Sequence, residues 1–256
     1  MEFINLKKIR ENIDDLSKDW NSKEPFRYIV VNDFLIPEKA EEVLNNYPSP
    51  WDGKWDNTTY INQKNKYQKR KFEKDSVFDR VFKELNSREF LQEMERITGI
   101  EDLIPDEELF GGGLHQSVTG AFLDVHIDYN IHPKTKQHRR MNIIIYMNKD
   151  WKDSYNGQLE LWDMDKKEML DKIAPNFNRM VIFETNQISY HGHPHPLKSP
   201  KGISRKSLAT YYYSATRPAN EIVGEHNTKY VNTEGSKGAV KNIRSAFKAL
   251  IERVTK

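Results

Sequence analysis

Apolar residues near the two ends of the chain recur with the period of a helix. Within residues 4–20 they are spaced three or four positions apart, as in one stripe of a helix: Ile9, Ile13, Leu16 and Trp20. Pro37 opens a short helical segment, and residues 76–99 show the helical period again. The tail repeats it from Val240 to Val254, which predicts a helical extension over about 236–255. We expect these helices to pack against a core.

The middle of the chain has a period of two, which is typical of strands. In AFLDVHID (121–128) one face carries Ala121, Leu123, Val125 and Ile127, and the other carries Phe122, Asp124, His126 and Asp128. Further strands are predicted at FRYIVVNDFL (26–35), MNIIIYMN (141–148), GQLELWD (157–163), RMVIFE (179–184) and KSLATYYYS (206–214). Residues 48–75 are predicted to be irregular. This pattern predicts a single domain over 1–256, with an antiparallel sandwich or barrel flanked by helices.

Composition narrows the class of protein. The 256 residues include 40 basic and 38 acidic side chains, and this balance makes nucleic acid an unlikely partner. The absence of cysteine excludes disulfides and thiolate sites. No apolar run is long enough to span a membrane, and the first residues lack the apolar block of a signal peptide. A soluble, cytoplasmic protein is therefore expected, with no membrane partner.

Histidines concentrate in the β-rich segment, where seven of the eight lie between residues 115 and 195. His126 and Asp128 are two positions apart on a predicted strand, so their side chains leave the same face. The segment SYHGHPHP (189–196) offers His191, His193 and His195 as a third ligand. Two histidines and one carboxylate on one face of a metal form the facial triad of non-haem Fe(II) oxygenases, with positions left open for substrates.

A possible anion receptor follows the histidines. Arg205 and Ser207 share one face of a predicted strand, fourteen and sixteen residues beyond His191. A guanidinium can donate two parallel hydrogen bonds to a carboxylate, and a nearby hydroxyl adds another donor. If Arg205 is buried, it needs an anionic partner, because an unpaired buried charge is costly. A dicarboxylate bound at the metal would supply one.

The order His-x-Asp, His, Arg-x-Ser resembles the 2-oxoglutarate/Fe(II)-dependent dioxygenase superfamily, and within it the prolyl 4-hydroxylase-like branch. The likeness covers about residues 108–216, in blocks such as HIDYN, RRMNIIIYMNKDW and SRKSLATYYYS. It implies a mainly β fold, with a double-stranded β-helix (jelly-roll) core packed by N- and C-terminal helices. It also implies iron ligands at His126, Asp128 and His191, and a 2-oxoglutarate site formed by Arg205, Ser207 and Tyr146.

The same resemblance implies hydroxylation of an unactivated C–H bond. 2-Oxoglutarate and O2 would be consumed, succinate and CO2 released, and ascorbate is a candidate reductant. Related halogenases carry a small residue in place of the acid, so Asp128 favours hydroxylation over halogenation; desaturation and ring formation stay open. Where related sequences carry Gly-Gly, this chain has Asn156-Gly157, and asparagine tolerates the positive φ that such a turn needs.

The substrate is left open by these residues. A prolyl or other peptidyl residue, a free amino acid, a sugar and a natural-product intermediate all fit the cofactor chemistry. Trp51, Trp55, Tyr60 and the basic stretch 61–74 are candidate substrate contacts. The alternative from another class is a non-catalytic jelly-roll module that binds peptide or carbohydrate. The oligomeric state is not predicted, although the C-terminal helix could form a dimer contact.

Overall fold

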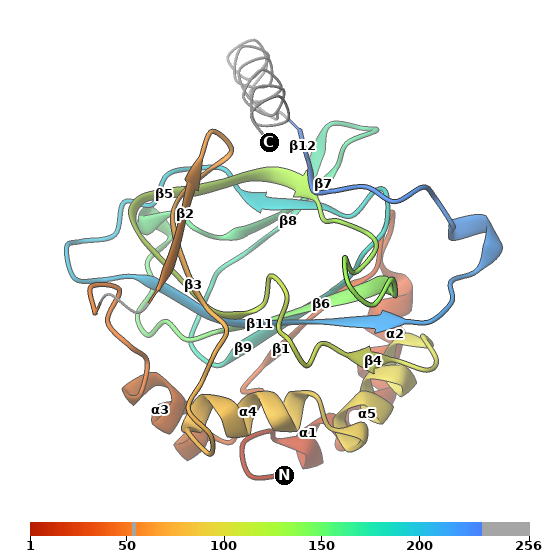
Figure 1. Ribbon diagram of the computed structural model, residues 1–256, viewed down its shortest axis with the longest axis horizontal. Helices are drawn as coiled ribbons and strands as arrows, with labels where there is room; N and C mark the ends of the chain where they lie inside the picture. Colours follow the sequence, from red (N-terminus) through yellow and green to blue (C-terminus); the bar gives the residue numbers. More distant parts are fainter. Residues whose placement is uncertain (53–54, 232–256) are drawn as a thin grey trace.

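The structure, a computed structural model, describes residues 1–52 and 55–231 (Figure 1). A curled antiparallel sheet forms its centre, and the helices gather on one side of that sheet (Figure 1). No helix in the described ranges is long and apolar enough to cross a membrane. The C-terminal helix predicted at about 236–255 lies outside the described residues.

Five α-helices are present in the described ranges. They are α1 (Leu6–Glu11), α2 (Ile13–Ser22), α3 (Pro37–Asn45), α4 (Val77–Leu85) and α5 (Arg88–Thr98). The single helices predicted at 4–20 and 76–99 are each two helices. The second pair breaks before Ser87, whose hydroxyl accepts a hydrogen bond from the backbone N–H of Phe90 and so caps α5. A side chain that satisfies the first free N–H groups starts a new helix at that point.

The strands of the main sheet follow the order β1-β9-β6-β11-β5-β10-β7-β8, with antiparallel pairing throughout. Their bounds are β1 (Tyr28–Asn32), β5 (Gly113–Ile127), β6 (His138–Tyr146), β7 (Leu159–Asp163), β8 (Glu168–Ile173), β9 (Arg179–Glu184), β10 (Tyr190–His193) and β11 (Arg205–Ser214). Shorter elements join its edges: β2 (Asp56–Tyr60), β3 (Gln63–Lys69), β4 (Ile104–Pro105), β12 (Lys229–Tyr230), and the 3-10 turns η1 (Asp153–Tyr155) and η2 (Ala219–Glu221). The predicted mainly β, jelly-roll architecture with flanking helices is confirmed.

The long strand β5 connects the two halves of the sheet. Its first part, 113–117, pairs with β11, and its last part pairs with β10, so that His126 lies opposite His191. The sequence pattern predicted only the second part of this strand, because the first part, GLHQSVTG, does not alternate cleanly between apolar and polar residues. By crossing from one half to the other, β5 brings the His-x-Asp pair close to the strand that carries Arg205.

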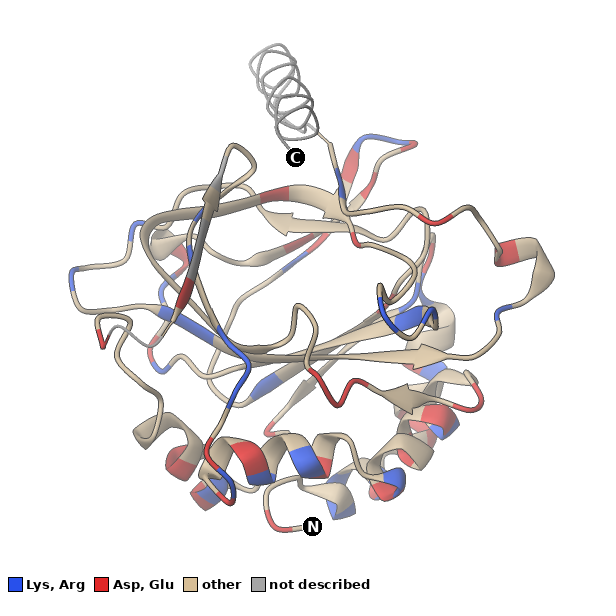
Figure 2. Ribbon diagram, viewed as in Figure 1, with Lys and Arg blue, Asp and Glu red and all other residues tan. Residues whose placement is uncertain are grey.

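The period of two divides β6 and β11 between the core and an inner face. Alternate residues pack against the helices and are fully buried: Ile143, Ile145, Leu208 and Tyr212. Each such side chain contributes about 1.5–3 kcal/mol by leaving water. The residues between them point to the other side of the sheet, where Asn142, Ile144, Ser207 and Tyr211 line a cavity. Charged residues lie mostly on the helices and loops (Figure 2).

The prediction of an irregular segment at 48–75 was wrong in its second half. Residues 56–69 form a hairpin, β2 and β3, and β3 pairs with β5. The sequence QKNKYQK in β3 lacks hydrophobic alternation, so local pattern could not reveal it. Backbone hydrogen bonds to β5 define this strand. The exposed strand β8 and the short strand β10 were not predicted either.

Candidate active site

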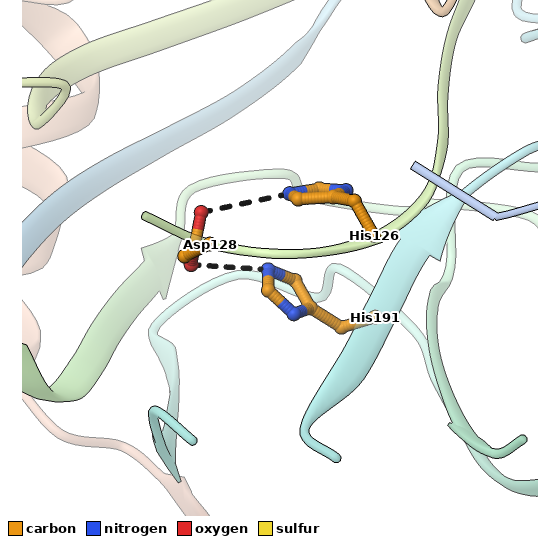
Figure 3. Close-up of side chains that lie close together, drawn as sticks. All are labelled: His126, Asp128 and His191. Carbon is orange, nitrogen blue, oxygen red and sulfur yellow. Dashed lines mark ion pairs between the residues drawn. The ribbon is translucent and has the colours of Figure 1, made fainter. Parts of the chain in front are cut away.

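Two histidines and one aspartate meet inside the curled sheet. His126 lies near the end of β5, Asp128 follows that strand directly, and His191 lies on β10. Their candidate ligand atoms all lie within 4.8 Å of one another. The Asp128 oxygens are 3.6 Å from His126 Nε2 and 3.5 Å from His191 Nε2 (Figure 3). The structure thus brings together the three residues that the resemblance implied as metal ligands.

The orientation of both imidazoles is set by backbone carbonyls. Nδ1 of His126 lies 2.8 Å from the Asp124 carbonyl oxygen, and Nδ1 of His191 lies 2.9 Å from that of Ser189. Each Nδ1–H can therefore donate to a carbonyl, which leaves the lone pair on Nε2 facing Asp128. Burial, and then the neighbouring His126, lower the pKa of His191 to about 4. The ring is neutral at pH 7, the form that binds a metal.

Asp128 is held by two side chains from β6. Arg139 Nη2 lies 3.0 Å from its Oδ2, and Asn142 Nδ2 donates to the same oxygen at 2.7 Å. Burial alone would raise the pKa of Asp128, but the charge of Arg139 and the nearby His191 and His126 outweigh burial and hold that pKa well below its usual range. The carboxylate is ionised at neutral pH. A neutral-imidazole and carboxylate set fits a divalent transition metal such as Fe(II).

Arg139 itself is almost completely buried, and the sequence pattern did not single it out as a site residue. Its guanidinium donates to Asn142 Oδ1 and lies 3.5 Å from the centre of the Tyr211 ring. The signal in the sequence was a doubled arginine, RRMN, at the start of an otherwise apolar strand. Only the strand's register shows which arginine points inward.

The other end of the cavity contains Arg205. Its Nε donates to the Gly157 carbonyl oxygen at 2.6 Å, and its Nη2 donates to the Tyr146 hydroxyl at 3.1 Å. The side chain is only 8% exposed. Among the described residues no carboxylate lies within 4.0 Å of this guanidinium, so its charge has no protein counter-ion there. Arg205 and Tyr146 are positioned to bind a carboxylate from a ligand.

One cavity of about 90 Å³ connects the two ends. The residues of the predicted site that line it are His126, Asp128, His191, Arg205 and Ser207. Tyr146 is not a lining residue, but its hydroxyl accepts a hydrogen bond from Arg205. The apolar side chains of Ile144 and Leu159 also line the cavity, and so do His115, Ser117, His193 and Lys66. His193 is thus a wall residue outside the three-residue cluster. Lys66 was predicted only as part of a basic loop.

Of the predicted substrate contacts, the basic stretch 61–74 reaches the cavity through Lys66, whereas Trp51 and Trp55 are not among the lining residues. Trp51 is 69% exposed and lines a separate hollow of about 520 Å³ on the outer side of β3, together with Tyr67. Trp55 stacks on Tyr47 and donates its indole N–H to the Ser49 carbonyl. The side chain of Tyr60 lies outside the described part of the chain. The structure therefore gives no support for Trp51 or Trp55 at this cavity.

Comparison with known proteins agrees with this geometry. Residues 112–213 match the model of the 2OG-Fe(II) oxygenase superfamily. A 93-residue stretch is 30% identical to prolyl 3-hydroxylase OGFOD1 of Mus musculus; it covers 34% of this chain and 17% of that protein. This chain therefore spans only about a sixth of that relative. For residues 112–213, this match confirms the resemblance to the 2OG-Fe(II) oxygenase superfamily that was noted from the motifs.

Solved structures show the same fold at low sequence identity. A prolyl hydroxylase from Trichoplax adhaerens, in complex with a hypoxia inducible factor peptide fragment, is 17% identical with a TM-score of 0.59, over 82% of this chain and 92% of that one. A prolyl-4-hydroxylase from Pseudomonas putida is 15% identical with a TM-score of 0.54, over 78% and 98%. These likenesses extend the shared fold beyond the segment that the family model matches.

Proposed function

We propose that this protein is an Fe(II)- and 2-oxoglutarate-dependent dioxygenase that hydroxylates an unactivated C–H bond of a prolyl or other amino-acid-type substrate. One observation carries the proposal. The His126, Asp128 and His191 cluster opens into the same cavity as Arg205, a buried cation without a carboxylate partner among the described residues. A metal at one end and an anion receptor at the other suit a ligand that chelates through one end and carries a carboxylate at the other.

Each side chain has a defined task in this proposal. His126, Asp128 and His191 would hold Fe(II), which supplies the activation of dioxygen coupled to loss of CO2 from 2-oxoglutarate. Arg205 and the Tyr146 hydroxyl would bind the distal carboxylate of 2-oxoglutarate, and Ser207 would lie beside them. Ile144 and Leu159 would pack against its methylene groups and exclude water.

The acid at position 128 supports hydroxylation as the outcome. Asp128 occupies a position that would be small in a related halogenase, and Arg139 and Asn142 hold its carboxylate in place. The substrate class is supported by the relatives, since both the sequence relative and the structural neighbours are named as prolyl hydroxylases. These likenesses support an amino-acid-type substrate and leave the choice between peptidyl and free forms open.

The test is formation of succinate from 2-oxoglutarate by the purified protein with Fe(II) and ascorbate, without added substrate. We expect slow uncoupled succinate formation that falls at least about a hundredfold in His126→Ala, because one of three metal ligands is lost. His195→Ala is the matched control, since this histidine of the same HGHPHP segment pairs with Glu160 outside the cluster. It should retain wild-type turnover.

Metal-dependent binding of 2-oxoglutarate, measured with Mn(II), covers the case of a tightly coupled enzyme. Wild-type protein should bind 2-oxoglutarate only with metal, and Arg205→Met should raise the Kd at least about thirtyfold. Absence of both succinate formation and metal-dependent binding would refute the oxygenase proposal. It would favour a non-catalytic jelly-roll module that binds peptide or carbohydrate.

A further inference from the structure

Lys66 on β3 points into the cavity of the proposed oxygenase site. It is half-buried and lines the same cavity as the metal-ligand cluster. Lys66 pairs with Ser117 of β5, and on the other side of β5 the same Ser117 pairs with Arg205 of β11. Two cations therefore flank one serine in a row across three neighbouring strands. Since adjacent strands lie about 4.8 Å apart, both side chains can reach one bound ligand or two ligands side by side.

Lys66 has no partner of its own in the described structure. Its ammonium makes no hydrogen bond or ion pair with any residue in the described ranges. Burial lowers its pKa to about 8; Asp128 raises this pKa, and the charges of Arg205 and Arg139 lower it. A lysine held in this way still carries its proton at pH 7, and an anion beside it would restore its usual pKa.

A count of charges shows that 2-oxoglutarate does not neutralise the cavity. In the described residues at the site, the cations are Lys66, Arg139 and Arg205, and Asp128 is the anion. The two charges of a divalent metal and the two of 2-oxoglutarate cancel each other. An excess of two positive charges therefore remains with both bound. Unpaired charge in a desolvated site is unfavourable, so a further anion would be stabilised there.

His193 adds a second unpartnered polar group to the same wall. Its side chain is 6% exposed and lines the cavity. Its Nδ1 is buried and has no hydrogen-bond partner among the described residues. This atom has almost no accessible surface, so Lys66, and not His193 Nδ1, is the unpartnered polar group that a ligand in the cavity can reach.

We propose that Lys66 binds a carboxylate of the primary substrate, so that the group presented to this oxygenase is anionic, either the α-carboxylate of an amino acid or an acidic side chain of a peptide. The inference rests on the proposed function. The two carboxylates of 2-oxoglutarate already have receptors, because Arg205 and Tyr146 take the distal one and the metal takes the other. Lys66 is left for a second molecule.

The experiment uses the protein loaded with Mn(II) and 2-oxoglutarate, which permits binding without turnover. The probes are N-acetyl-L-proline and N-acetyl-L-alanine, each compared with its C-terminal amide, an uncharged analogue of the same size. Binding is measured from the broadening of probe proton signals by the nearby Mn(II). We expect each acid to bind at least tenfold more tightly than its amide in the wild type.

Variants at position 66 identify the group responsible. Lys66→Met keeps the length of the side chain without its charge and should reduce the preference for acids to twofold or less. Lys66→Arg should retain most of the preference. Lys64→Met is the matched control, because Lys64 lies on the same strand but is exposed and outside the cavity lining; it should behave as the wild type.

Two outcomes would overturn the inference. Equal binding of acids and amides by the wild type, including no binding of either, would show that Lys66 does not select a carboxylate. A rise of tenfold or more in the Kd of 2-oxoglutarate in Lys66→Met, with the preference for acids unchanged, would assign Lys66 to the co-substrate. Loss of Mn(II)-dependent 2-oxoglutarate binding in the wild type would instead refute the proposed function itself.

Discussion

The two ends of the cavity differ in how their buried charges are compensated. At the metal end, Asp128 forms an ion pair with Arg139 and accepts a hydrogen bond from Asn142. Backbone carbonyls orient both histidines. At the far end, Arg205 and Lys66 have no carboxylate within ion-pair distance in the described part of the chain. The first end is complete within the protein, while the second depends on a ligand for its counter-ions.

This difference indicates what each end contributes to binding. Metal-ligating side chains that are already held rigidly lose little conformational entropy when a metal binds. The metal end therefore favours tight binding in one fixed geometry. Cations without partners lower stability in the absence of a ligand and gain most when an anion binds. Removal of an unpartnered cation at the far end should therefore weaken binding and raise stability. Three substitutions test the comparison between the two ends, from the largest expected effect to the smallest.

Arg139→Met should have the largest effect, because it removes the protein's own counter-charge at the metal end. Asp128 would be left as an uncompensated buried charge, and breaking such a pair costs about 3–5 kcal/mol. Since a divalent metal supplies positive charge to the same carboxylate, Mn(II) should restore more stability to this variant than to the wild type. Thermal unfolding with and without Mn(II) measures both effects.

Arg140→Met is the control for that comparison. Arg140 is the neighbouring residue, and its ion pair with Glu221 is 3.9 Å long with a half-exposed partner. Its loss should cost about 1 kcal/mol or less and should not change the response to metal. If Mn(II) stabilised wild type and Arg139→Met by the same amount, Arg139 would not be compensating Asp128.

Gly157→Ala should have an intermediate effect at the far end. Gly157 has a φ of +81°, and an added Cβ would clash with Leu197 Cδ2 and lie 3.0 Å from Arg205 Cδ. The backbone strain and the clash together should lower the free energy of unfolding by about 2–4 kcal/mol. Because Arg205 must move, the Kd of 2-oxoglutarate should rise about tenfold. Gly202→Ala also introduces a side chain at positive φ, but into open space, so it separates the strain from the contact with Arg205.

Lys66→Met should have the smallest effect and the opposite sign. The pKa of Lys66 is about 8 in the folded protein against 10.5 for an unperturbed lysine, so between these values the unfolded chain binds more protons. The charged Lys66 therefore lowers the free energy of unfolding by its full amount below about pH 8, and this loss disappears as pH rises toward 10.5. At pH 7 the variant should be more stable by about 1 kcal/mol, after allowance for solvent screening of this half-buried side chain.

Urea unfolding across pH 7–10.5 measures the gap in free energy of unfolding between wild type and Lys66→Met, with Lys64→Met as the control. The gap between wild type and Lys66→Met should shrink across pH 8–10.5. A gap that stayed constant over this range would show that Lys66 is not desolvated in the folded protein.

Much of the site could be predicted from local sequence. His126 and Asp128 share a strand face because they are two positions apart, and the same rule places Arg205 with Ser207. The alternating segments 141–148, 179–184 and 206–214 were predicted as strands and are strands. In each case the signal lies within a few residues, where a period of two or 3.6 directly determines which side chains share a face.

Only the tertiary structure decided the charges that surround these residues. The pairing of Lys66 with Ser117, and of Ser117 with Arg205, joins strands that are far apart in the sequence. Strand β3 has no hydrophobic pattern from which it could be predicted. Its hydrogen bonds to β5 define both the strand and the face on which Lys66 lies. Local sequence determined which residues could bind a metal and an anion, whereas cross-strand register determined which cations meet in the cavity.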